Sequence, residues 1–195
     1  MLPTTNRRLI SNFVALTLVQ GTNFLLPLIV MPYVIRQIGP EGFGIISLAH
    51  VVMIYLSTMS DYGFNLTATR DIALHKNDTF KVSKIFAVVL ASKILITLLV
   101  FILLLILVWV IPIFRANMYV YLFGFVYVVG QSLLISWFFQ GFERMHYITL
   151  VTLLSRLIFV ALVLVFIKAK SDSFLFLLFL GSGNIIAGLI SILMA

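Results

Sequence analysis

Arg156 is the residue that most directly suggests chemistry, because it lies near the middle of a long apolar run. Inserting a central arginine into a bilayer costs about 2.5–3.5 kcal/mol, and charges inside membranes usually face a cavity or a partner. Thr149, Thr152 and Arg156 follow one another at i, i+3 and i+7, which places them on one face of a helix. We interpret this polar stripe as the wall of a cavity that binds an anion. The alternative is an arginine that only satisfies backbone carbonyls.

Other polar side chains within the apolar runs fit the same interpretation or a simpler one. Lys93 either lines the cavity or extends its ammonium to the lipid headgroups. Asn23 and Gln131 either line the cavity or form hydrogen bonds between helices. Both deep ionisable groups, Lys93 and Arg156, are cationic, whereas the nearest carboxylate, Asp61, stands at a helix end. A cavity built this way suits an anionic ligand better than a cationic one.

The connection Asp61–Arg70 carries a carboxylate, a glycine and an arginine between two apolar segments. Gly63 can adopt the left-handed backbone conformation that ends a helix. The charged residues that follow, as far as Lys84, are typical of a solvated loop. We therefore predict a helix end at Asp61 followed by a polar loop outside the membrane.

The composition places the whole chain in a membrane. It is 63% hydrophobic and 10% charged, with a mean hydropathy of +1.20, whereas soluble domains carry about 25% charged residues. The absence of cysteine excludes disulfides and thiolate metal sites, and the three histidines are too scattered for a metal cluster, so we expect no metal and no cofactor. The net charge of +7 fits cytoplasmic loops or an anion-binding cavity. Nucleic acid is not expected as a partner, because there is no basic soluble surface.

At about 20 apolar residues per transmembrane helix, the chain contains about six spans. They are predicted at 9–34, 43–59, 85–111, 119–139, 147–167 and 174–194. Pro112 ends the third, because proline cannot continue a helix. Lys and Arg are more frequent at the amino end and in the second and fourth connections, which predicts a cytoplasmic amino terminus and a cytoplasmic 61–84 loop. The predicted fold class is all-α, a polytopic membrane protein.

Residues 1–195 are expected to form a single transmembrane domain. The sequence contains no soluble domain, linker or clear internal repeat, and it stops directly after an apolar run. Many transporters consist of two related helix bundles with the substrate path between them. Six helices correspond to one bundle, so we expect a fragment or a truncated version of such a transporter. No enzymatic activity is expected, because the chain has no Ser/His/Asp grouping, phosphate-binding Gly-Lys loop or pair of deep carboxylates.

Three motifs together resemble one known family. They are Pro32–Gly44 (PYVIRQIGPEGFG), Asp61–Arg70 (DYGFNLTATR) and Trp137–Met145 (WFFQGFERM). Each is similar to a loop signature of the bacterial polysaccharide flippases, the O-antigen transporter family, and their order and spacing agree as well. The candidate functional residues in these motifs are Arg36, Glu41, Asp61, Arg70, Gln140, Glu143 and Arg144.

The resemblance implies a transporter of the bacterial inner membrane. Such transporters flip undecaprenyl-pyrophosphate-linked saccharide units to the periplasmic face for the assembly of lipopolysaccharide and other surface polysaccharides. The family's fold resembles the multidrug and toxin extrusion transporters, with two lobes around a central cavity, and this chain would be the amino-terminal lobe. The implied partners are the anionic lipid-linked saccharide, membrane lipid, the polysaccharide polymerase and the chain-length machinery.

The same resemblance suggests roles for the cationic residues. Lys93 and Arg156 would offset the charge of the pyrophosphate as it crosses the membrane. The planar guanidinium of the loop arginines Arg36, Arg70 and Arg144 suits phosphate. Arg36 and Arg70 could equally hold loops in place through ion pairs with Glu41 and Asp71.

Three other functions stay open beside a flippase. A cation-coupled multidrug exporter of the same superfamily would require a carboxylate deep in the lobe, and the first span has none. A membrane glycosyltransferase or polymerase would require acidic residues or histidines in a sizeable periplasmic loop, but the connections between the predicted spans are short. A truncated flippase would be inactive on its own.

Overall fold

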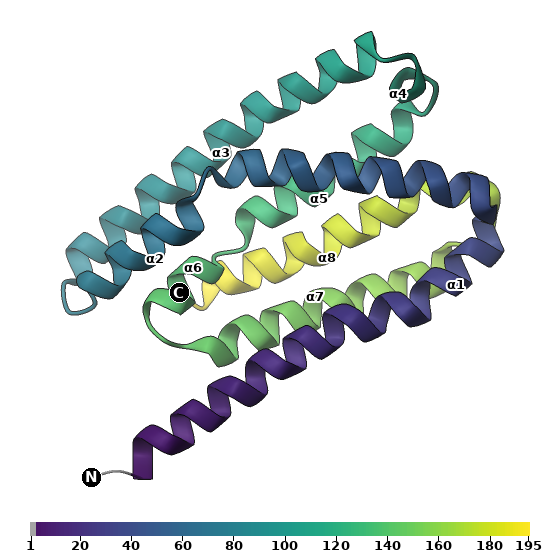
Figure 1. The fold of residues 1–195 in the computed structure, drawn as a ribbon. Coiled ribbons are helices and arrows are strands. Elements are labelled where there is room, and N and C mark those ends of the chain that lie inside the picture. The colour runs from purple at the N-terminus through teal and green to yellow at the C-terminus, as the bar shows by residue number, and fades with distance from the viewer. Residues whose placement is uncertain (1–2) are drawn as a thin grey trace.

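The computed structural model of the chain is an all-α helix bundle (Figure 1). It describes the backbone of residues 3–195 and the side chains of Thr17, Gly21 and residues 28–195, and it contains no strand in the described part. The helices are α1 (Pro3–Asp61), α2 (Phe64–Leu74), α3 (Thr79–Val110), α4 (Pro112–Ala116), α5 (Met118–Leu133), α6 (Ser136–Gly141), α7 (Met145–Phe166), the 3-10 helix η1 (Lys170–Asp172) and α8 (Ser173–Leu193).

Five stretches of the described residues are long and apolar enough to cross a membrane. The first of them joins the later part of α1 to α2, and the others correspond to α3, α5 with α6, α7, and η1 with α8. Large apolar side chains along α3 such as Leu98, Ile102 and Trp109 are more than half exposed, as expected of a surface in contact with lipid. The chain is therefore a multi-pass membrane protein.

Helix α1 contains the first two predicted spans, and a sharp bend at Gly39 separates them. Gly39 has φ 85° and ψ 163°, a backbone conformation open essentially to glycine. Pro40 follows it and cannot donate the hydrogen bond that would continue the first arm. The prediction of a loop at Pro32–Gly44 was wrong, since the backbone is helical on both sides of this one residue. We call residues 3–38 the first arm of α1 and residues 40–61 the second arm.

The segment after Asp61 also differs from the prediction. Tyr62 and Gly63 both have positive φ and end the second arm, as expected of Gly63. The chain then forms helix α2 rather than a solvated loop, because Ala68 and Ile72 bury an apolar face against α6 and the start of α3. At the next turn the backbone N–H of Lys81 donates to the Asp78 carboxylate, which caps α3 and holds the pKa of Asp78 below its ordinary value.

The other predicted spans agree with the structure to within a few residues, with one exception. The third, fifth and sixth correspond to α3, α7 and α8. The fourth, predicted at 119–139, is interrupted at Leu134 and Ile135, which have extended or irregular backbone angles and separate α5 from α6. The fully buried Trp137 and Ile135 hold this irregular corner in a small apolar core together with α2 and the start of α3.

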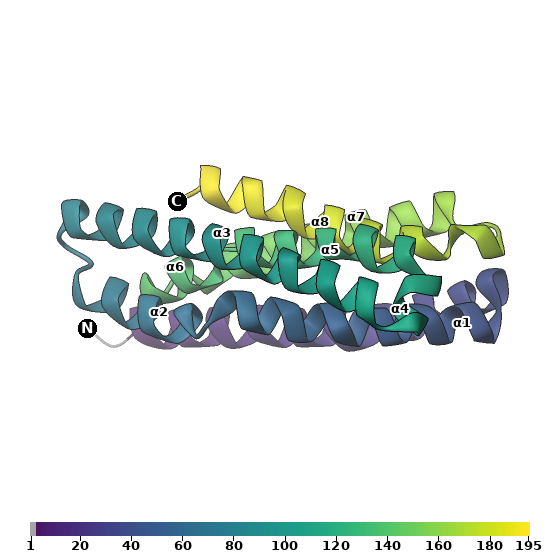
Figure 2. The same ribbon diagram turned by 90° about the horizontal axis from the view of Figure 1, so that it is seen from above.

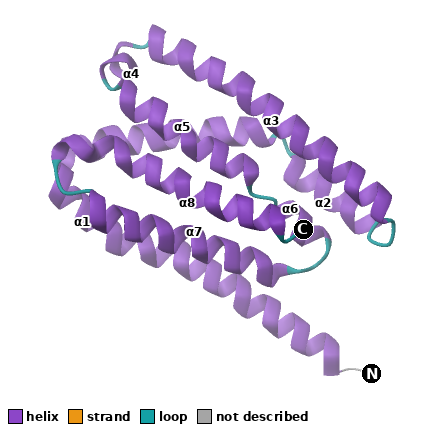
Figure 3. Ribbon diagram, turned by 180° about the vertical axis from the view of Figure 1, so that it is seen from behind, coloured by secondary structure: helices purple, strands orange, loops and turns teal. Residues whose placement is uncertain are grey.

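The long helices form two layers (Figures 1 and 2). The two arms of α1 form one layer, and α3, α5, α8 and α7 form the other, with α8 between α5 and α7 (Figure 3). The amino end of α1, the α2–α3 turn, α6 and the C-terminus lie at one end of the bundle, and the Gly39 bend, α4 and η1 lie at the opposite end (Figures 1 and 2). This alternation of ends is the one expected of successive membrane crossings.

Glycines allow α8 to approach α5 closely at the centre of the second layer. A Cβ atom added to Gly181 would come within 2.4 Å of the backbone of Val126 and Tyr127. A Cβ added to Gly130, on the facing helix, would lie 2.7 Å from the Gly181 carbonyl oxygen. Such small residues at the contact are the common device by which helices associate in lipid. The small-residue face of α8 therefore serves packing.

Candidate functional site

Arg156 faces the interior of the bundle rather than lipid. It lies halfway along α7, is partly buried, and borders a cavity of about 90 Å³. The cavity is lined from both arms of α1 and from α7 and α8, by Val30, Met31, Phe43, Ile46, Ser47, His50, Arg156, Phe159, Phe176 and Leu180. The guanidinium is thus one of very few polar groups in an otherwise apolar cavity.

His50 and Tyr127 are two polar side chains that lie close to Arg156. His50, on the second arm of α1, and Tyr127, on α5, are both within electrostatic reach of the guanidinium. Their rings meet edge to face, with 5.4 Å between the centroids. Among residues 28–195, whose side chains are described, no carboxylate forms an ion pair with Arg156. The positive charge of this site is therefore not balanced by these residues.

The threonines predicted to share a face with Arg156 do not border this cavity. Thr149 is buried and donates its hydroxyl to the Met145 carbonyl of its own helix, at 3.3 Å, and Thr152 is partly buried. The neighbouring Ser155 instead crosses to α8, where its hydroxyl donates to Asn184 Oδ1 at 2.6 Å. Asn23 lies among residues 22–27, whose side chains are outside the described set.

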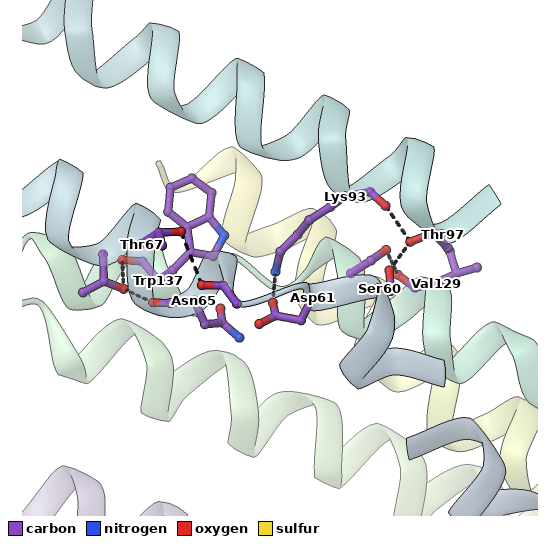
Figure 4. Close-up of polar contacts among 11 residues, drawn as sticks. Ser60, Asp61, Asn65, Thr67, Lys93, Thr97, Val129 and Trp137 are labelled. Carbon is purple, nitrogen blue, oxygen red and sulfur yellow. Dashed lines mark hydrogen bonds and ion pairs between the residues drawn. The ribbon is translucent and has the colours of Figure 1, made fainter. Parts of the chain in front are cut away.

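A second polar site surrounds Lys93 on α3 (Figure 4). Its side chain does not extend to the end of the bundle: Lys93 is 2% exposed, and its Nζ lies 2.7 Å from Asp61 Oδ1 at the end of α1. Nearby, the Thr97 hydroxyl donates to the Lys93 carbonyl and lies 2.5 Å from the Ser60 hydroxyl. These contacts tie the end of α1 to the middle of α3.

The ion pair borders a polar pocket of about 200 Å³ between α1, α2, α3 and α5. Its lining residues are Ser57, Thr58, Asp61, Asn65, Lys93, Gln131 and Ser132. Gln131 also interacts with Tyr127, one turn earlier on α5, and Tyr127 in turn lies near Arg156. The two polar sites are therefore neighbours within the bundle, connected through Gln131 and Tyr127.

The arginines of the three motifs are exposed at the ends of the bundle. Arg36 and Glu41 flank the Gly39 bend, whereas Arg70 and Arg144 lie at the opposite end. The anticipated pairing of Arg36 with Glu41 is not among the ion pairs of the described residues, nor is a pairing of Arg70 with its neighbour in sequence.

The second and third motifs meet where the Thr69 hydroxyl donates to the Trp137 carbonyl at 3.2 Å. Glu143 connects the third motif to the α2–α3 turn. Its carboxylate lies 2.7 Å from Lys76 Nζ, which joins the α6–α7 corner to the α2–α3 turn. Gln140, one turn earlier, is exposed, and the Arg144 guanidinium lies 5.8 Å from the centre of the Phe142 ring. Of these three residues, Glu143 is the one that holds two turns of the chain together.

The sequence analysis missed His50 as a member of the interior site. Histidines were considered there only as metal ligands. The helical spacing could have predicted that His50 points inward. Ile46 and Met53, at i−4 and i+3 from His50, are almost fully buried. A polar residue between two buried apolar positions of one helical face is expected to point inward.

Comparison with known proteins identifies the family of the chain. The family described as "Polysaccharide biosynthesis protein" matches residues 9–195. A "Putative O-antigen transporter" of Escherichia coli (strain K12) is 38% identical over 182 residues, which are 93% of this chain and 44% of that protein. A protein of the same name from Shigella dysenteriae is 30% identical over 181 residues, 93% of this chain and 45% of that protein.

No solved structure matches the chain. The chain spans less than half the length of the two curated relatives, although nearly all of it takes part in both matches. The polytopic helix bundle, the three motifs and the match along residues 9–195 agree with one another. The chain therefore belongs to the polysaccharide biosynthesis protein family.

Proposed function

We propose that this chain forms one lobe of a transporter that moves lipid-linked saccharide units across the bacterial inner membrane for O-antigen or other surface polysaccharide assembly. Two relatives carry the name O-antigen transporter, and the chain spans less than half of each. The lobe would act together with a second lobe that completes the substrate path. The carried molecule is an anionic polyprenyl-pyrophosphate-linked saccharide, whose isoprenoid tail remains in the lipid.

The observation that carries this proposal is the uncompensated charge of Arg156. A cation held within the membrane needs a partner, because leaving it unpaired costs several kcal/mol. No carboxylate of the described residues supplies that partner. A pyrophosphate or an acidic sugar would supply it during transport, and the fork of guanidinium donors matches phosphate oxygens.

The direction of transport follows from the distribution of basic residues. The end of the bundle that carries the amino end of α1, the α2–α3 turn and the α6–α7 corner holds more Lys and Arg than the end with the Gly39 bend. We infer that the basic end faces the cytoplasm. The lipid-linked unit, assembled on that side, would enter there and leave at the Gly39 end.

A cation-coupled drug exporter fits the observations less well. Such a transporter needs a carboxylate free to bind the cation or a proton within the lobe. Asp61, the acidic residue bordering the interior pocket, is already paired with the Lys93 ammonium. We therefore favour the anionic substrate.

The experiment that tests the proposal is a chimera. The 182 residues that match the Escherichia coli relative replace the corresponding segment of that protein, and the chimera is expressed in a strain whose own O-antigen transporter is deleted. We expect surface polysaccharide to reappear, and to be lost when the chimera carries Arg156→Ala at equal membrane level. Full polysaccharide from the Arg156→Ala chimera would contradict the proposed role of the charge.

A further inference from the structure

The pocket beside the Asp61–Lys93 pair is unusual for this chain, because every residue that lines it is polar. The chain is 63% hydrophobic, yet all the lining side chains carry hydroxyl, amide, carboxylate or ammonium groups. A neighbouring cavity of about 270 Å³, lined by Ile94, Thr97, Leu98, Phe101, Phe125, Val129, Ser132 and Leu133, is mostly apolar. Lipid or packing would explain the second cavity but not the first, in which the buried Lys93 and Ser132 meet the exposed Thr58 and Asn65.

The charge of the pocket differs from that of the Arg156 cavity. The carboxylate of Asp61 and the ammonium of Lys93 are 2.7 Å apart and cancel formally. An anion entering the pocket would be repelled by Asp61, and a cation would be repelled by Lys93. The pocket therefore favours an uncharged ligand that forms many hydrogen bonds.

The pocket offers both hydrogen-bond donors and hydrogen-bond acceptors to a ligand. The Lys93 ammonium has three N–H donors and pairs in charge with Asp61, so it can donate to a ligand as well. Asn65 and Gln131 each offer an amide donor and an amide acceptor. The hydroxyls of Ser57 and Thr58 donate to the Ile54 carbonyl, which leaves their oxygens as acceptors. This mixture of donors and acceptors matches a ring that carries several hydroxyl groups.

Trp137 supplies an independent sign of a missing partner. Its side chain is fully buried, and its indole Nε1 has no hydrogen-bond partner, whereas buried indole N–H groups usually find one. In Figure 4 the indole nitrogen lies on the edge of the ring that faces Lys93 and Asp61. Trp137 does not itself line the pocket, so we infer that it senses a ligand from the side of Lys93 and Asp61.

The volume of the pocket is comparable to that of one sugar ring. Its 200 Å³ equals the space of about six or seven water molecules at ~30 Å³ each, which is close to the space that a single hexose with its hydroxyls displaces. The pocket opens where Asp61 is partly exposed and Asn65 is exposed, near the end that we assign to the cytoplasm.

We propose that the pocket lined by Asp61, Asn65, Lys93 and Gln131 binds one uncharged sugar ring of the transported unit. This inference rests on the proposed function, and it assigns the saccharide and the anionic group to separate sites of the lobe. The Asp61–Lys93 pocket holds the sugar, and the Arg156 cavity holds the charged group. Gln131 lines the Asp61–Lys93 pocket and interacts with Tyr127, which lies near Arg156, so we infer that the two sites bind parts of one molecule.

The test uses Trp137 as a reporter in the purified 195-residue chain in nanodiscs. The chain has two tryptophans, and Trp109 is 75% exposed on α3, so Trp109→Phe leaves Trp137 as the single emitter. The probes are the methyl glycosides of galactose, N-acetylglucosamine and rhamnose, titrated into the millimolar range, with inorganic phosphate as the anionic probe. Saturation-transfer NMR on the glycoside protons reads binding independently of the fluorescence.

We expect at least one glycoside to shift the Trp137 emission saturably and to show saturation transfer. Asn65→Ala and Gln131→Ala should each weaken that binding by about fivefold or more, the equivalent of a lost hydrogen bond. Asn77→Ala, an exposed amide in the α2–α3 turn, is the matched control and should bind the glycoside like the parent chain.

Three results would overturn the sugar site. They are no glycoside binding in either measurement, binding of phosphate alone, and glycoside binding that neither pocket variant weakens. None of these results decides whether the proposed function is correct, because the chimera experiment tests Arg156 and measures polysaccharide at the cell surface. A transporter that needs Arg156 but binds no glycoside in this pocket would refute only the further inference.

Discussion

The ammonium of Lys93 lies 2.7 Å from the carboxylate of Asp61, and the two residues differ sharply in exposure. The Lys93 side chain is 3% exposed, whereas that of Asp61 is 25% exposed and reaches the polar pocket. The lysine thus depends on its partner more than the carboxylate does, because an unpaired buried charge has no water to replace the lost partner.

This difference predicts unequal effects of breaking the pair from its two sides. Asp61→Ala should destabilise the folded chain by about 3–5 kcal/mol, because it leaves a buried ammonium unpaired. Lys93→Met should cost less, since the remaining carboxylate can be hydrated from the pocket. Unfolding in detergent, followed by helical circular dichroism, measures both.

The control for this experiment is a surface ion pair on the same helix. Lys81 lies 3.5 Å from Asp78, and both side chains are well exposed. Lys81→Met should change stability by no more than about 1 kcal/mol. If Asp61→Ala proved as mild as Lys81→Met, the buried pair would have no special part in the fold.

Close packing of α5 on α8 predicts opposite effects of two glycine substitutions. Gly181→Ala should markedly lower the folded fraction, because its Cβ would meet the rigid backbone of Val126 and Tyr127. Gly44→Ala, in the second arm of α1, has nothing within 4 Å of the added Cβ. It should be neutral or stabilising by about 0.5–1 kcal/mol, the ordinary helix preference for alanine.

Membrane yield and thermal unfolding of the two glycine variants distinguish these outcomes. Equal stability of both variants would show that α5 and α8 can separate at no cost. That result would contradict the close approach seen in the structure.

The membrane topology can be tested directly because the chain has no native cysteine. Asn77, in the α2–α3 turn, and Met118, at the start of α5, are exposed at opposite ends of the bundle. Single cysteines at these positions should react with a membrane-impermeant maleimide from opposite sides. Met118→Cys should be labelled in intact spheroplasts, and Asn77→Cys only after permeabilisation. Labelling of both from outside would exclude the proposed orientation.

The helices of this fold could be predicted because lipid demands long apolar runs with internally satisfied backbones. The predicted 85–111 and 147–167 spans agree with α3 and α7 to within a few residues for that reason. The turns could not be predicted equally well. Charged residues suggested a loop after Asp61, and the resemblance to a loop signature suggested one around Gly39, but helices exposed at a membrane face tolerate charge as readily as loops do.

Contacts between helices distant in sequence were beyond the sequence analysis. Lys93 and Asp61 were both named as candidate residues from the sequence. Their pairing depends on the register of α1 against α3, which a local sequence pattern cannot predict. The polar lining of the pocket likewise requires residues of α1, α2, α3 and α5 to meet. Arg156, in contrast, was predictable as an inward-facing residue, because a single charge in an apolar helix already limits its surroundings.

The last prediction separates the charge of Arg156 from its shape. Arg156 borders a small, largely apolar cavity, with His50 and Tyr127 as its polar neighbours. If the guanidinium compensates an anionic group of the substrate, Arg156→Lys in the chimera should keep part of the surface polysaccharide, since the charge remains while the bidentate fork is lost. Arg156→Ala should remove most of it without lowering the membrane level, because deleting a charge within the bilayer makes insertion easier.

The matched control for these variants is Arg115→Ala, which removes an exposed arginine from α4 at the Gly39 end and should leave polysaccharide unchanged. Polysaccharide is measured by gel electrophoresis of extracted lipopolysaccharide, with the chimera quantified in the same membranes. A graded order, with the parent highest, Arg156→Lys intermediate and Arg156→Ala lowest, is the signature of a charge that acts on the substrate. If Lys and Ala fail equally, the fork geometry rather than the charge is what the site requires. If loss of function instead follows reduced membrane level, Arg156 serves the fold, and an anion-binding cavity is no longer needed to explain it.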